Sequence, residues 1–75
     1  MRLKSYVVCD RRGRPLYRPD PDLLNLRMEL IDISKTPGFQ LMVDVGDFAY
    51  KVIDIDESTG DPWCLDGAGV KFLAN

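Results

Sequence analysis

The side chains with the clearest capacity for chemistry in this chain are four arginines near its start. They fall within eight positions, at Arg11, Arg12, Arg14 and Arg18. A guanidinium group is always charged and pairs bidentately with carboxylate or phosphate. The spacing therefore predicts a contact with an anionic partner: an acidic protein surface, a nucleotide or a nucleic acid. The alternative is a solvated turn attracted to acidic parts of its own chain.

Charge is divided unevenly along the 75 residues. Residues 1–18 hold six basic side chains and one acidic side chain, which gives +5, and residues 19–75 hold four basic and eleven acidic, which gives −7. The two sums recover the net charge of −2. A nucleic-acid module is usually basic overall, whereas this chain has a pI near 4.8, so a protein partner is favoured over nucleic acid.

Catalytic side chains are scarce. The chain has no histidine, which removes the commonest general base and metal ligand. Carboxylates are plentiful, but no pair stands out. The stretch from Asp54 to Asp61 alternates carboxylates as calcium loops do, but Thr59 and Leu65 occupy the positions that need glycine and glutamate. We expect a non-enzymatic protein with no cofactor and no metal.

Two cysteines and one tryptophan complete the candidates. Cys9 and Cys64 are expected to be small buried thiols, with a disulfide between them as the less favoured alternative. Trp63 is expected in the core, and an exposed Trp63 would be the best single interface anchor. No apolar run approaches the length of a membrane span or a signal peptide, which predicts a cytoplasmic protein that does not enter membranes.

The elements that position these side chains are mostly short strands. Apolar and polar residues alternate, which is the pattern of half-buried strands. Glycine, proline and aspartate punctuate the alternation about every ten residues. We expect a single mainly β domain, residues 1–75, in the form of a small SH3-like or OB-like barrel or sandwich of about six strands. The strands are expected at residues 6–10, 15–18, 26–33, 39–45, 48–55, 63–65 and 70–73.

One segment fits two structures. Asp20 and Pro21 are typical of a helix start, and the apolar residues Leu23, Leu26, Leu30 and Ile33 share one helical face. The same stretch also fits an alternating strand from Leu24 to Leu30, and β-branched Ile31 and Ile33 favour a strand. The strand at 26–33 is the preferred interpretation. The alternative is an α+β fold with one helix at about 21–33 packed on an antiparallel sheet.

Two short segments resemble the PilZ family, which binds cyclic diguanylate on a β-barrel. Arg14 and Arg18 form an RxxxR pattern, and residues 32–38, Asp-Ile-Ser-Lys-Thr-Pro-Gly, resemble the later [D/N]xSxxG pattern. Gly38 falls one position late, and the resemblance covers about a third of the chain. It implies a nucleotide or cyclic-dinucleotide sensor as the alternative function.

The preferred functional hypothesis is a small binding protein. We expect a regulator or inhibitor that docks on another macromolecule through a basic hairpin near its N-terminus. Phages and mobile elements encode blockers of this size that act on host machines such as RNA polymerase or CRISPR effectors. The partner-binding residues are expected to be Arg11, Arg12, Arg14, Arg18 and Trp63.

Overall fold

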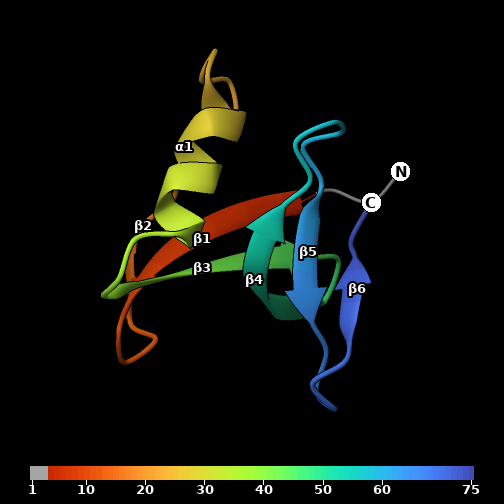
Figure 1. The fold of residues 1–75 in the computed structure, drawn as a ribbon. Helices are drawn as coiled ribbons and strands as arrows, with labels where there is room; N and C mark the ends of the chain where they lie inside the picture. The colour runs from red at the N-terminus through yellow and green to blue at the C-terminus, as the bar shows by residue number, and fades with distance from the viewer. Residues whose placement is uncertain (1–3) are drawn as a thin grey trace.

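The fold is one antiparallel sheet with a short helix on one face. A computed structural model describes residues 4–75 (Figure 1). In chain order the elements are β1 (Lys4–Asp10), β2 (Pro15–Tyr17), α1 (Leu26–Ser34), β3 (Phe39–Val45), β4 (Phe48–Ile55), β5 (Pro62–Leu65) and β6 (Lys71–Leu73). The mainly β prediction is confirmed. No helix among residues 4–75 is long and apolar enough to cross a membrane.

The strands lie in the order β2-β1-β3-β4-β5-β6. Four hairpins join neighbours along the chain, and α1 carries the chain from β2 across to the far side of β1. The β3–β4 connection is a two-residue turn with Gly46 at φ +59°, a conformation that glycine adopts without strain. The predicted bounds of these two strands, 39–45 and 48–55, agree with the structure.

The core lies on the face of the sheet that carries α1. Along β3, Leu41, Val43 and Val45 point into this face and are at most 4% exposed, while their neighbours Met42 and Asp44 are only half-buried. The pairing of β1, β4 and β5 with their neighbours places further side chains on the same face of the sheet as these three residues. These are Val8 on β1, Val52 and Ile55 on β4, and Cys64 on β5.

The preferred strand at residues 26–33 is wrong, because Leu26–Ser34 forms α1. Leu26, Leu30 and Ile33 recur at helical spacing and pack against the core, with Leu30 only 2% exposed. The alternative prediction of one helix on an antiparallel sheet agrees with this arrangement. Its expected start at 21 is early: Asp20 instead begins a turn, where its carboxylate accepts a hydrogen bond from the Asp22 backbone N–H.

The expected barrel or sandwich is not formed by the residues described, because their strands make one open sheet. The sheet curls until the start of β1 approaches the residues after β6. There the Lys4 side chain donates to the Ala74 carbonyl at 3.3 Å and pairs with Asp61 at 2.6 Å. A side chain therefore bridges the gap that a backbone ladder would close in a barrel.

Candidate functional site

The candidate site is the arginine turn, residues 10–14, which joins β1 to β2. One Asp10 carboxylate oxygen accepts the backbone N–H groups of Arg12 and Arg14, both at 2.9 Å, and the other accepts Arg14 Nε at 3.0 Å. Gly13 has φ +82°, which allows the chain to reverse within this loop. The same carboxylate thus braces the backbone and fixes one arginine.

Two further contacts hold the arginine turn. Asp10 N–H donates to the Arg14 carbonyl at 2.9 Å, and Gln40 Nε2 of β3 donates to the Arg11 carbonyl at 2.7 Å. The hydrogen bond from the Arg14 backbone, followed by that from Arg12, lowers the pKa of Asp10 below its ordinary value. Asp10 is therefore ionised at neutral pH and keeps its bracing role.

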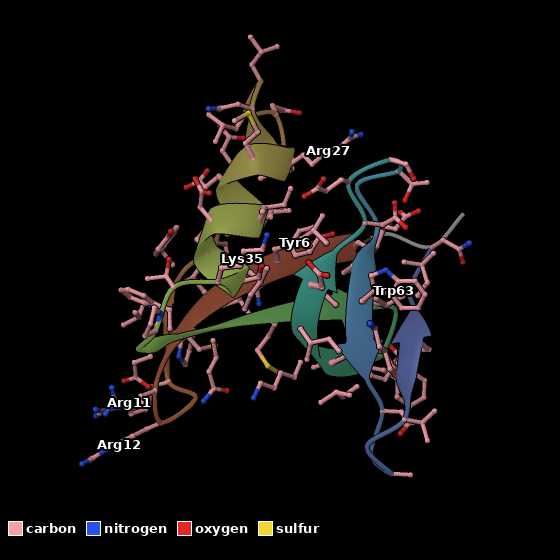
Figure 2. All side chains as sticks on the ribbon, in the orientation of Figure 1. Tyr6, Arg11, Arg12, Arg27, Lys35 and Trp63 are labelled. Atoms are coloured by element: carbon pink, nitrogen blue, oxygen red, sulfur yellow. The ribbon has the colours of Figure 1, made fainter. Side chains whose placement is uncertain are left out.

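The four predicted arginines divide into two kinds. Arg11 and Arg12 are exposed, make no ion pair with any residue from 4 to 75, and extend away from the sheet (Figure 2). Arg14 is held by Asp10. Arg18 pairs with Asp44 at 3.1 Å and donates to Ser5 Oγ at 2.9 Å. Of these four guanidinium groups, those of Arg11 and Arg12 are the two without an ion pair to residues 4–75.

Exposed apolar side chains lie next to the arginine turn, and none of them was expected from the sequence to be part of the site. Phe39 stands opposite Asp10 in the β1–β3 ladder and is 46% exposed. Leu16 and Tyr17 follow the turn on β2 and are also about half exposed, at 52% and 47%. The sequence signal was available for Phe39, because it is the first residue of a strand and follows a glycine turn.

Trp63 lies outside this site and outside the core. It sits on β5 between the buried residues Pro62 and Cys64, so strand alternation turns its side chain to the opposite face of the sheet. There it is half-buried, with Lys71 Nζ 4.9 Å from the ring centroid. The expectation of a core tryptophan is wrong, and three strands separate β5 from β2. Figure 2 shows Trp63 at the other side of the molecule from Arg11 and Arg12.

A hollow of about 400 Å³ lies beside the start of β1. Lys4 and Asp61 neutralise each other within it. Burial, and then the charge of Asp61, raises the pKa of Tyr6 to about 12. Because Lys4 and Asp61 pair with each other, neither charged side chain of this hollow is free to bind a ligand. Its lining is Lys4, Ser5, Tyr6, Pro19, Pro21, Leu26, Thr59, Gly60 and Asp61.

The acidic loop after β4 is occupied by its own hydrogen bonds. Asp56 accepts from the Ser58 hydroxyl at 2.6 Å and from the Ser58 and Thr59 N–H groups. These bonds lower the pKa of Asp56, the Ser58 hydroxyl most. Among residues 4–75 no three potential ligands gather as a metal site.

The segments that resemble PilZ have different local structures here. Arg14 and Arg18 flank β2, and both are engaged by aspartates of this chain. Asp32 and Ser34 belong to the last turn of α1, where Ser34 Oγ donates to the Ile31 carbonyl at 2.8 Å. A phosphate would have to displace these internal contacts.

The two cysteines are buried free thiols, as the preferred expectation has it. Cys64 belongs to the core face, whereas Cys9 alternates with core residue Val8 and lies on the opposite face. Comparison of the chain with protein-family models, curated proteins and solved structures finds no match. The geometry of the arginine turn is therefore the feature of this chain that bears most directly on its function.

Proposed function

We propose that this chain is a non-enzymatic binding protein that docks through the arginine turn on an acidic surface of a protein partner. The observation that carries the proposal is the pair of unpaired guanidinium groups, Arg11 and Arg12, on a loop braced by Asp10. A partner that covers this loop with carboxylates supplies the ion pairs that the described chain does not provide.

The hydrogen bonds that hold the backbone of the arginine turn favour high affinity for a partner. Ordering a flexible loop on binding costs roughly 0.5–1.5 kcal/mol for each immobilised rotamer-rich side chain, in addition to the backbone. In the arginine turn, the Asp10 carboxylate and Gln40 already fix the backbone. Phe39 adds an exposed aromatic group beside the two arginines, and aromatic and arginine side chains dominate the energies of protein interfaces.

A protein partner is preferred over a nucleic acid because of the rest of the molecule. Residues 19–75 carry a net charge of −7, which would repel a long phosphate backbone beyond the turn. A single acidic patch on a protein avoids this repulsion. A compact module that attaches by one charged loop suits a regulator or inhibitor that covers a surface of a larger assembly.

The test uses two double charge reversals that change net charge equally. Arg11→Glu with Arg12→Glu, and the control Arg27→Glu with Lys35→Glu at two exposed cations in and just after α1, each take the net charge from −2 to −6, because each replaces two cations by two anions. Wild-type and variant chains are immobilised and partners from host cells are quantified by mass spectrometry. We expect recovery of the partner to fall by about tenfold or more for the arginine pair only.

The captured partner is then purified and titrated against each chain. Its affinity for wild type should fall with added salt, because exposed ion pairs are screened. Recovery that is equal for wild type and the arginine variant would contradict the proposal. The alternative, a nucleotide sensor of PilZ type, is tested by calorimetry with nucleotides and cyclic dinucleotides, and heat of binding that is lost in Arg14→Ala would support it instead.

A further inference from the structure

The face of the sheet opposite α1, here called the outer face, carries several apolar side chains, and it is covered only in part, where Val7 and Cys9 are 9% and 4% exposed. An antiparallel sheet with one covered face normally presents polar side chains on the other. Here the ladder register and burial pattern instead place a mostly apolar set on the outer face. Its apolar members are Val7, Cys9, Met42, Ala49, Ile53, Trp63, Leu65 and Leu73. Its polar members are Ser5, Gln40, Asp44, Lys51, Asp54 and Lys71.

Two lysines stand among these apolar residues. Lys51 on β4 pairs with Leu65 on β5, which pairs in turn with Lys71 on β6, so all three lie in one row across the sheet. The two lysines are two strands apart, about 10 Å. Both are exposed, and neither forms an ion pair with a residue from 4 to 75.

One of the two carboxylates on the outer face is paired with a cation, and the other is exposed and lies outside the row of Lys51, Leu65 and Lys71. Asp44 pairs with Arg18 at 3.1 Å, and Asp54, opposite Trp63 in the ladder, accepts the Ile55 N–H at 2.8 Å. The Lys71 ammonium lies over the Trp63 ring at 4.9 Å. The uncompensated charge of the row is therefore positive, set among apolar side chains.

We propose that the outer face is a second binding surface, separate from the arginine turn, for an acidic peptide segment of a protein partner with apolar side chains. Its carboxylates pair with Lys51 and Lys71, and its apolar groups pack on Trp63, Leu65 and Met42. A second copy of this chain is a poorer occupant, because stacking two outer faces would bring the lysine rows of both copies together without carboxylates between them.

The test selects peptides from a displayed library of random 16-residue sequences on the immobilised full chain. We expect the enriched peptides to combine aspartate or glutamate with leucine or aromatic residues. A synthetic enriched peptide should bind wild type and shift the emission of Trp63, which reports directly because it is the only tryptophan.

Two double charge reversals, one on each surface, separate the outer face from the arginine turn. The peptide affinity should fall about tenfold or more for Lys51→Glu with Lys71→Glu, and should stay unchanged for Arg11→Glu with Arg12→Glu. All four replaced side chains are exposed, and far-ultraviolet circular dichroism checks that each variant is folded. Leu65→Ala is a further variant of the outer face, which removes apolar surface between the two lysines and leaves the net charge unchanged.

Three results would overturn the inference. They are a selection without enrichment, enriched peptides without acidic residues, and binding that ignores the lysine pair and leaves Trp63 emission unchanged. If the peptides lose affinity only for the arginine variant, the proposal that the outer face binds them is wrong and the arginine turn is their binding site. Partner recovery that is unchanged in the arginine variant, together with peptide affinity that falls only in the lysine variant, would overturn the arginine turn and support the outer face, so the two proposals fail separately.

Discussion

Asp10 is the residue on which the arginine turn depends. One side chain accepts two backbone N–H groups and one guanidinium, so its loss would leave several donors without a partner at once. Arg11 and Arg12 owe their availability to this arrangement, because Asp10 is engaged by Arg14 and does not pair with either of them. Asp10 therefore supports the loop, and its neighbours Arg11 and Arg12 are free to bind a partner.

The two thiols give a prediction at the same scale. Cys9 and Cys64 are 4% and 0% exposed, and burial is the main cause that raises the pKa of each thiol. Both should react with a disulfide reagent about a hundredfold more slowly in the native chain than in urea, because reaction requires opening of the sheet. Absorbance during labelling measures the two rates. Fast labelling of either thiol in the native chain would contradict the burial described.

At the scale of elements, α1 is attached to the sheet through one side chain above all. Leu30 is 2% exposed, whereas Met28 on the same helix is 66% exposed. Leu30→Ala should lower the free energy of unfolding by about 2–5 kcal/mol. Met28→Ala is the matched control and should change it by less than about 0.5 kcal/mol.

Urea unfolding followed by circular dichroism measures both variants. A small domain has a total stability of only about 5–15 kcal/mol, so the Leu30 variant should lose a large share of it. Equal effects of the two substitutions would show that the helix does not depend on the buried leucine.

The strands were more predictable than the helix, for a physical reason. Alternation from Phe39 to Val45 and a two-residue turn at Gly46 define a hairpin locally. Residues 26–33 satisfy both periods, and the choice depends on contacts between Leu30 and distant strands. The sequence also could not show on which face of the sheet Trp63 lies. Strand alternation places Trp63 and Cys64 on opposite faces, but it does not show which of the two faces α1 covers.

The candidate site was predictable in part. The run of arginines identified the turn, but the sequence could not show that Asp10 would engage Arg14 or that Asp44, 26 positions away, would engage Arg18. Both pairings depend on the strand order that brings β2, β1 and β3 together. The sequence shows Phe39 as the first residue of a strand, but not that it lies near the arginine turn, because its place opposite Asp10 is a long-range pairing.

At the scale of the whole molecule, several ionised carboxylates support the fold. Hydrogen bonds lower the pKa of Asp10, Asp56 and Asp61, the largest for Asp61 coming from Lys4. Groups with a native pKa below the unfolded value stabilise the fold when ionised. This contribution is present above about pH 4 and is lost as the pH falls through the lowered native values.

The urea midpoint should therefore be lower at pH 2.5 than at pH 7, as followed by Trp63 fluorescence. Asp61→Asn removes the pairing with Lys4, so this variant should be less stable at pH 7 and should lose less on acidification. A midpoint that is the same at both pH values would count against these contacts. A variant with the full pH dependence of wild type would exclude Asp61 as a contributor.

The contact between Lys4 and the Ala74 carbonyl has a consequence for how this domain can be joined to others. It holds the two ends of the described chain together at one side of the sheet, while the arginine turn projects from the other (Figure 1). Domains whose ends meet can be inserted into a surface loop of a host protein, entering and leaving at nearly the same point. A tag or host domain at either end would leave Arg11 and Arg12 facing outward.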